Sequence, residues 1–259
     1  NMTSLRQLCL AALVASDPDD KLAMVSSLAS ANTMPEPAER LAEPASLPGR
    51  PPRPHMVAPK DVPQRSLGNV EGRAALLHAL AHIEFNAINL ALDAVWRFDG
   101  MPEQFYRDWL KVAIEEAYHF RLLRERLSTL GYAYGDFPAH NGLWEMAEKT
   151  RDDVLARLAL VPRTLEARGL DASPPIRAKL AGAGDMDSAA ILDIILRDEI
   201  GHVAIGNHWY RYVCDQRGVD PVITYAQLAE HHRAPRLRGP FNLEARRAAG
   251  FEQAELDAL

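Results

Sequence analysis

Cysteine is scarce in this chain of 259 residues, and its 29 basic residues are outnumbered by 35 acidic ones. The only cysteines are Cys9 and Cys214, which are too few for a disulfide scaffold and lack the spacing of a zinc site. The formal net charge of −6 argues against a general nucleic-acid binder, although it leaves room for a specific RNA substrate. A reducing, cytoplasmic location fits this composition best.

Long apolar runs, strand patterns and nucleotide-binding glycine motifs are also missing. No segment approaches the roughly 18 consecutive apolar residues that span a bilayer, so we expect no membrane contact. Residues 8–15 imitate a short secretory core, but only Arg6 precedes them, and we expect a small amphipathic helix there. Because no Gly-x-Gly-x-x-Gly fingerprint is present, any reducing equivalents would come from a separate electron-donor protein. The lack of strand alternation predicts an all-α fold.

Proline, in contrast, is abundant in one stretch. Nine of the 18 prolines lie between Pro35 and Pro63, which excludes a regular element there. The embedded apolar residues Leu47, Met56 and Val57 favour an extended strap packed along a helical bundle over a free linker or a proline-rich ligand for a partner. Before this stretch, residues 3–31 predict two short helices separated at 17–20.

Apolar residues at helical spacing predict four long helices, near 69–98, 103–130, 142–168 and 186–217. Turns are expected at 99–102 and 182–184, and Gly131 should end the second helix. Residues 131–141 then form the crossover between two antiparallel hairpins. A short helix should start at 173–175 and another should cover 222–232. We therefore divide the chain into an N-terminal extension packed on the bundle (1–66), a four-helix bundle (67–217) and a C-terminal helical arm (218–259).

Two Glu-x-x-His pairs, one in each predicted hairpin, are the most informative feature of the sequence. A solitary glutamate precedes the first pair by 32 residues and the second by 33. A glutamate and a histidine three residues apart share one face of a helix, so each pair can reach one metal ion. The predicted ligands are Glu84, Glu116, His119, Glu166, Glu199 and His202.

The surroundings of these residues favour a metal over a solvated helix face. The same-face neighbours of Glu84 are apolar: Leu77, Ala81, Ile88, Ala91 and Val95. An ionised carboxylate in such a stripe costs several kcal/mol unless it is paired or metal-bound. Glu166 is the least secure ligand, because Pro162 interrupts its helix and Glu145 and Glu148 are alternatives. Glu166 is preferred to these two residues, because it lies in the same relation to Glu199, across the turn before the fourth helix, as Glu84 does to Glu116.

The tail carries a local excess of positive charge. Its five arginines are Arg233, Arg236, Arg238, Arg246 and Arg247. A solvated surface or a packed C-terminal arm is one interpretation, and a contact with an anionic or RNA partner near the metal site is the other. His231 and His232 are candidate extra ligands, but adjacent helical residues point in different directions.

The sequence resembles the ferritin-like superfamily of di-metal helical bundles. More narrowly, it resembles a bacterial family in that superfamily that carries a domain-of-unknown-function label. The resemblance rests on RSLG (65–68), LAHIE (80–84), AVWRF (94–98), EEAYH (115–119), LEARGL (165–170), LRDEIGH (196–202) and PFN (240–242). It implies a ferritin-like four-helix bundle with N- and C-terminal extensions. It also implies the same six metal ligands, but it names no substrate.

The ligand set predicts a carboxylate-bridged centre of two transition-metal ions, most readily iron, with manganese as an alternative. We expect an oxidoreductase that activates dioxygen or peroxide on a small-molecule or tRNA-type substrate, and oligomers are compatible with the sequence. Asp198, Tyr118 and His82 are candidates for holding the imidazoles in place. The alternative is a non-catalytic metal-binding or storage bundle with a structural site. Two-metal hydrolysis is less typical of such a ligand set.

Overall fold

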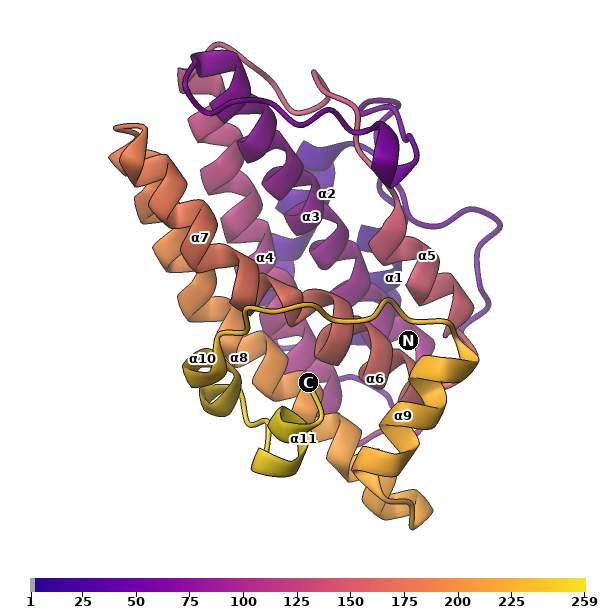
Figure 1. The fold of residues 1–259 in the computed structure, drawn as a ribbon. Coiled ribbons are helices and arrows are strands. Elements are labelled where there is room, and N and C mark those ends of the chain that lie inside the picture. Colours follow the sequence, from indigo (N-terminus) through magenta and orange to yellow (C-terminus); the bar gives the residue numbers. More distant parts are fainter. Residues whose placement is uncertain (1–2) are drawn as a thin grey trace. The chain divides into compact units, whose positions relative to one another are not determined.

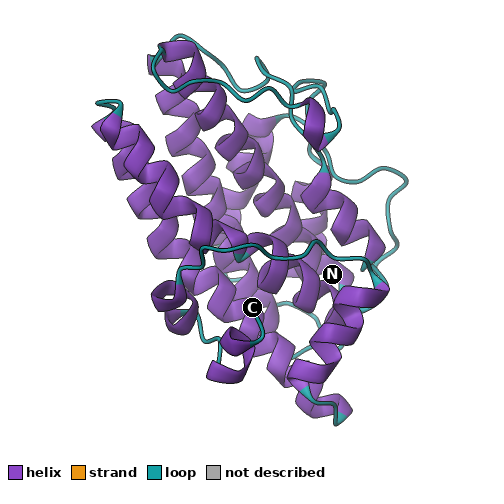
Figure 2. Cartoon of the chain, in the orientation of Figure 1, coloured by secondary structure: helices purple, strands orange, loops and turns teal. Residues whose placement is uncertain are grey.

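The computed structural model describes residues 3–259, and within this range every regular element is helical (Figures 1 and 2). The all-α class is therefore confirmed. The chain forms two compact units, residues 1–142 and residues 143–259. The first contains α1 (Leu5–Val14), α2 (Pro18–Ser30), the short 3₁₀ helix η1 (Pro59–Asp61), α3 (Val70–Arg97) and α4 (Glu103–Thr129). The second contains α5 (Gly142–Lys149), which begins at the boundary, α6 (Val154–Leu160), the π-helical segment η2 (Val161–Glu166), α7 (Arg168–Gly182), α8 (Met186–Arg217), α9 (Pro221–His231), α10 (Leu243–Ala248) and α11 (Gln253–Asp257).

A helical hairpin of α3 and α4 is the centre of the first unit, as the sequence predicts. Asn69 begins α3 by accepting the backbone N–H of Gly72 at 2.8 Å, which satisfies one free donor of the first turn. Gly100 forms the turn between the helices with a φ of +76°, a conformation that glycine adopts without steric cost. Gly131 follows α4 with a φ of +87° and ends it in the expected place.

The two N-terminal helices pack on this hairpin through buried cations. Arg6 of α1 is fully buried and donates from Nε to the carbonyl of Val95 at 3.0 Å and from Nη2 to that of Trp96 at 2.6 Å. These carbonyls belong to the last turn of α3, which has no helical donors left for them. Lys21 of α2 caps α1 in the same way, with Nζ 2.9 Å from two carbonyls of its last turn. Burial lowers the pKa of Lys21 to about 7.

The proline-rich stretch lies within the first unit as an extended strap held by backbone hydrogen bonds. The backbone N–H of Gly49 donates to the carbonyl of Leu13 in α1 at 2.8 Å. Farther along, the N–H of Val57 donates to the carbonyl of Ala139 at 2.8 Å, and the N–H of Ala139 donates to the carbonyl of His55 at 3.0 Å. The strap is therefore paired with the 131–141 segment by backbone hydrogen bonds.

The predicted continuous helix at 142–168 is wrong, because two local hydrogen-bonding groups divide it. Arg157 donates to the carbonyl of Ala147 at 2.6 Å and to the Thr150 hydroxyl at 3.1 Å, which closes the end of α5. Asp153 then accepts the N–H of Leu155 at 3.0 Å and starts α6. The expected helix from 142 to 168 is thus three short pieces, α5, α6 and η2.

The predicted helix start at 173–175 is also wrong, since α7 begins at Arg168 and contains Pro174 and Pro175. Pro174 has no N–H to give to the carbonyl of Leu170, four residues earlier. The side-chain amide of Asn242 donates to that carbonyl at 3.1 Å instead. A residue 72 positions away therefore allows the helix to continue through a proline.

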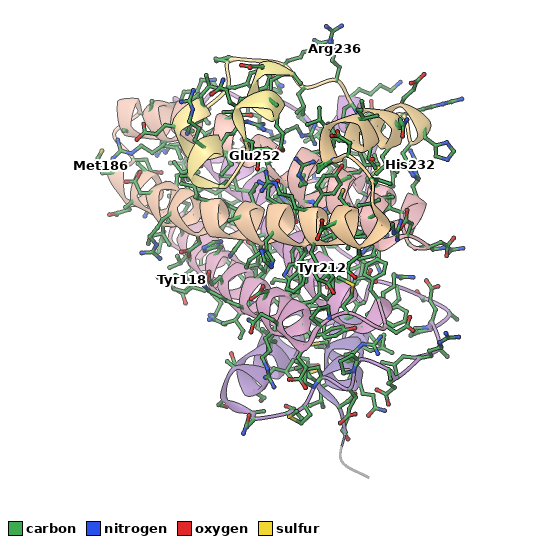
Figure 3. All side chains as sticks on the ribbon, turned by 90° about the horizontal axis from the view of Figure 1, so that it is seen from below. Tyr118, Met186, Tyr212, His232, Arg236 and Glu252 are labelled. Atoms are coloured by element: carbon green, nitrogen blue, oxygen red, sulfur yellow. The ribbon has the colours of Figure 1, made fainter. Side chains whose placement is uncertain are left out.

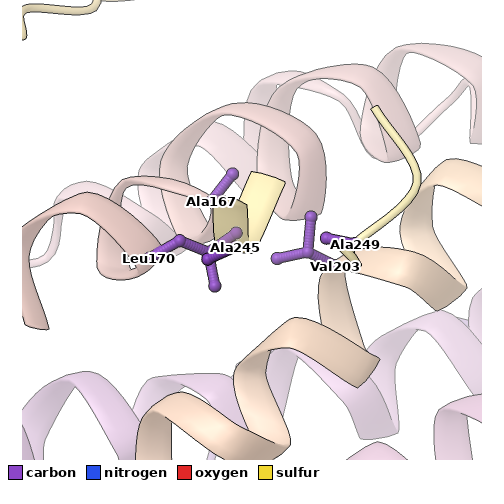
Figure 4. Packing of buried hydrophobic residues seen from close by; sticks show 5 residues of the cluster. All are labelled: Ala167, Leu170, Val203, Ala245 and Ala249. Atoms are coloured by element: carbon purple, nitrogen blue, oxygen red, sulfur yellow. The ribbon is translucent and has the colours of Figure 1, made fainter. Parts of the chain in front are cut away.

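The C-terminal arm packs on α7 and α8 within the second unit. Ala245 and Ala249 of the arm lie against Ala167, Leu170 and Val203 in a cluster of buried small side chains (Figure 4). A helix is present at 221–231, close to the predicted 222–232. The arm is thus part of the core of this unit.

The position of Arg246 corrects the prediction of a basic surface patch of five arginines. It is 1% exposed, and its guanidinium donates to both carboxylate oxygens of Asp171, at 3.0 and 2.6 Å. The other four arginines of the patch are exposed. Arg246 therefore holds the arm to α7, and the packed-arm interpretation holds for this residue.

One helix, α3, is long and apolar enough to cross a membrane by composition, with a mean hydropathy of 1.3 over its most apolar window. However, 72% of that window is buried inside the structure. A core helix of a soluble protein has the same composition, so α3 is weak support for a membrane span.

Candidate metal centre

Three of the predicted ligands meet in the first unit. Glu84 comes from α3, and Glu116 and His119 come from one face of α4. The Nδ1 atom of His119 lies 3.2 Å from Oε2 of Glu116 and 3.4 Å from Oε2 of Glu84. One ligand atom from each residue lies within 4.8 Å of the others. These three residues, called the first half-site below, are close enough to hold one metal ion.

Burial and donor chemistry both suit the first half-site to a cation. Glu84, Glu116 and His119 are 5%, 1% and 0% exposed. Two carboxylates with one imidazole carry a formal negative charge even when the imidazole is protonated, and burial makes such a charge costly. Carboxylate oxygen with imidazole nitrogen is a donor set that suits iron, manganese or zinc. Three protein ligands would leave coordination positions open for a substrate or an oxidant.

A second Glu-x-x-His pair has the same geometry in the second unit. His202 of α8 is buried, and its Nδ1 atom lies 3.2 Å from Oε1 of Glu199. The corresponding distance between His119 and Glu116 is also 3.2 Å. In both pairs one turn of helix places the carboxylate directly beside the ring nitrogen. The sequence repeat is therefore a structural repeat at the level of these side chains.

Glu166 ends the π-helical segment η2 and is half-buried. The N–H of Ala167 donates to the carbonyl of Pro162 at 3.1 Å, which is the i to i−5 bond of a π-helix. Pro162 packs against Gly206 of α8 so closely that a Cβ at Gly206 would lie 2.7 Å from the Pro162 Cβ. This close approach fixes η2 against the helix that carries Glu199. Single π turns occur often at functional sites.

Of the residues expected to hold the imidazoles, His82 has the most extensive hydrogen bonding. Its Nδ1 atom lies 2.8 Å from the Tyr134 hydroxyl, and its Nε2 atom lies 3.0 Å from the carbonyl of His140. Burial lowers the pKa of His82 to about 4, so the ring is neutral at pH 7. Its position one half-turn before Glu84 ties the α3 ligand helix to the 131–141 segment.

Tyr118 and Asp198 have other neighbours. Tyr118 is 39% exposed on the outer side of α4, with its ring centroid 6.1 Å from that of His119 (Figure 3). The carboxylate of Asp198 forms an ion pair with the neighbouring Arg197 at 3.0 Å.

Three polar residues near the first half-site escaped the sequence analysis. Tyr134 lies beside His82, and burial raises the pKa of its phenol. The side-chain nitrogen of Asn86 lies 3.0 Å from Nε2 of His82, and Asn89 is fully buried with neither amide atom hydrogen-bonded within residues 3–259. Two asparagines in a long apolar helix were the available signal. Buried amides in such a helix need polar partners, so they mark a polar interior.

His231 and His232 have their ring centroids 4.8 Å apart on α9, edge to face. Desolvation, followed by the neighbouring His231, lowers the pKa of His232. The two rings contact each other, which adds no support to a role as metal ligands.

Comparison with known proteins places the chain in a family. The chain is similar to a Haemophilus influenzae protein described as "Uncharacterized protein", with 55% identity over 214 residues, which is 80% of this chain and 74% of that protein. No solved structure matches the chain. Residues 14–257 match the family model described as "Protein of unknown function (DUF455)". Because this match covers nearly all of the sequence, the chain belongs to the DUF455 family.

Proposed function

We propose that this protein is a carboxylate-bridged di-metal oxidoreductase that activates dioxygen or peroxide on a substrate. In this proposal the α3–α4 hairpin and the hairpin formed by η2, α7 and α8 come together as a ferritin-like four-helix bundle. The observation that carries the proposal is the pair of matching Glu-x-x-His geometries, each with a carboxylate 3.2 Å from the imidazole Nδ1.

The six residues predicted from the sequence would share two metal ions, iron with iron or iron with manganese. Glu116 and Glu199 would bridge the ions, and His119 and His202 would each bind one of them. Glu84 and Glu166 would complete the ligand set. When bound, such a pair of ions supplies oxidation–reduction chemistry that amino-acid side chains lack.

The protein's own contribution is to hold the ligand side chains in position and to shield them from water. The buried positions of Glu84, Glu116 and His119 exclude water from the first half-site. The α3–α4 hairpin fixes these three side chains on rigid helices, so little reorganisation is needed when a metal binds. The second Glu-x-x-His pair, Glu199 and His202, has its own support, because the Pro162–Gly206 contact fixes η2 against α8, the helix that carries the pair.

Metal content tests the proposal directly. Protein loaded anaerobically with iron(II) should retain about two ions per chain, by analogy with two-metal sites that use a similar ligand set. His119→Gln and His202→Gln should each lose metal. His208→Gln, an exposed histidine on α8, is the matched control and should retain it. Less than half an equivalent of any transition metal in the loaded protein would refute the proposal.

Oxygen consumption separates the oxidoreductase from a storage or structural protein. Iron-loaded protein should consume dioxygen in an oxygen-electrode assay, and the His119→Gln variant should not. Iron binding without oxygen consumption, together with a large loss of stability on chelation, would indicate a structural site instead. A cytoplasmic location, a separate electron donor and a small-molecule or tRNA-type substrate are further parts of the proposal.

A further inference from the structure

A pocket of about 440 Å³ lies in the second unit, among α9, the segment after it and the last two helices. Its volume is within the range of small-molecule sites. Most of its wall is apolar and includes Val222, Ala229, Leu237 and Phe251. Figure 1 shows the segment 232–242 running from α9 to α10. Ala234, Pro235, Arg236 and Leu237 of this segment line the pocket.

Arg163 of η2 lines this pocket and has an unused hydrogen-bond donor. Its side chain is 4% exposed. Nε donates to the Asn207 side-chain oxygen at 2.6 Å, and Nη2 donates to the carboxylate of Glu255. Nη1 is buried and has no hydrogen-bond partner among residues 3–259. A buried donor without an acceptor is costly, and a ligand that accepts from it would remove that cost.

Aromatic rings surround the guanidinium but do not replace this acceptor. The Cζ atom lies over the rings of Tyr210, Tyr225 and Phe251, at 4.1, 5.1 and 5.3 Å from their centroids. Such contacts stabilise the face of a guanidinium through the ring quadrupole. Its N–H groups lie in the plane of the guanidinium, so Nη1 still requires an acceptor in that plane.

The local charge favours an anionic ligand. Glu255, the carboxylate that pairs with Arg163, also accepts from Nη2 of Arg211 at 2.6 Å, so two guanidinium groups share it. Desolvation lowers the pKa of Arg163, although Glu255 acts in the opposite direction. Arg163 therefore shares its one carboxylate partner with Arg211, which also lies 3.8 Å from Glu252.

Other charged residues of the pocket select the kind of anion. Arg246 is engaged with Asp171, and Arg236 is exposed and projects away from the ribbon, which leaves Arg163 as the buried anchor (Figure 3). Glu230 and Glu255 also line the pocket and would repel a doubly charged phosphate more than a singly charged carboxylate.

We propose that this pocket binds a small monocarboxylate with an apolar body. Its carboxylate accepts from Nη1 of Arg163, and its apolar body lies against Val222, Ala229 and Leu237. This site depends on the second unit alone and is independent of whether the protein binds metal.

Calorimetric titration with decanoate as the probe tests this site in the full-length protein. Decanoate should bind at one site per chain. Decanol, which has the same body without the charge, should bind at least tenfold more weakly, and decyl phosphate should also bind more weakly than decanoate. No binding of decanoate up to about 1 mM, a ceiling that still detects very weak ligands, would overturn the proposal. Equal binding of decanol, or tighter binding of decyl phosphate, would also overturn it.

Substitutions locate the binding within the pocket. Ala229→Phe fills the pocket and leaves Arg163 intact, so it should weaken decanoate binding at least tenfold. Gln227→Phe adds the same ring on α9 to a residue that does not line the pocket, and it should bind decanoate as the unmodified protein does. Arg163→Lys keeps the charge but removes Nη1, and it should also lose at least tenfold. Unchanged decanoate binding by Ala229→Phe would refute the assignment even if the Arg163 variant fails to fold.

Discussion

Glu84→Gln should make the metal-free protein more stable while weakening its response to metal. The substitution keeps the shape of the side chain and removes its negative charge from the first half-site. Ligand atoms of Glu84 and Glu116 lie within 4.8 Å of each other. At that separation and an effective dielectric constant of about 20, two like charges repel by about 3 kcal/mol. The hydrogen bond with His119 is long, at 3.4 Å, and its loss offsets about 1 kcal/mol of this.

The metal-bound protein should respond in the opposite direction. Metal at roughly a thousandfold excess over its dissociation constant contributes about 4 kcal/mol to the unfolding free energy. If the lost ligand weakens metal binding about a hundredfold, about 3 kcal/mol of that contribution disappears. The opposed signs distinguish a ligand from a residue that merely stabilises the fold.

Chemical denaturation with and without iron(II), near pH 8, measures both effects. Glu125→Gln is the matched control, because Glu125 is exposed on the same helix as Glu116. It should leave both unfolding free energies unchanged. If Glu84→Gln lowers the stability of the metal-free protein by more than about 1 kcal/mol, the carboxylate is a structural partner of His119, and the reasoning is refuted.

Three further predictions concern the supports of the site. Gly206→Val should cost roughly 1–3 kcal/mol of unfolding free energy, because a Cβ there meets Pro162 at 2.7 Å; a cost within about 0.5 kcal/mol would show that η2 and α8 can separate freely. Asn242→Ala should cost about 1–2 kcal/mol of unfolding free energy, because it removes the donor to the Leu170 carbonyl, to which Pro174 has no N–H to give. In a Pro174→Ala background the same change should cost less. His78 has its pKa lowered to about 4 by burial, chiefly through desolvation, so below pH 6.5 the unfolded chain binds a proton that the folded chain does not. Stability should therefore fall by up to about 3 kcal/mol between pH 6.5 and 4, and a His78→Phe variant should lack this part of the pH dependence in denaturation measured across that range.

Much of the helical arrangement followed from the sequence because the signals are local. The spacing of apolar residues along α3, α4 and α8 predicts their ends to within one residue, and glycines at 100 and 131 mark where the chain turns. The Glu-x-x-His pairs were equally local. A separation of three residues on any helix puts the carboxylate beside the imidazole, so both 3.2 Å contacts were implied by the spacing.

The failures came from interactions between residues distant in the sequence. Arg157 closes a helix by reaching back ten residues, and Asn242 lets a helix run through Pro174 by reaching back to α7. Neither contact leaves a periodic signal. Burial of Arg246 against Asp171 removed one arginine from the expected basic surface for the same reason.

The sequence by itself determined the all-helical class, the α3–α4 hairpin and the pairing of carboxylate with imidazole in each Glu-x-x-His, because helix periodicity fixes which side chains share a face. Only the tertiary structure decided that Glu84 reaches the same imidazole as Glu116, since that contact depends on how α3 packs against α4. It also decided that Glu166 ends a π-helical turn wedged against Gly206 and that Arg163 keeps an unused donor beside a pocket. These features depend on the distances between helices, and no pattern within a single helix encodes such distances.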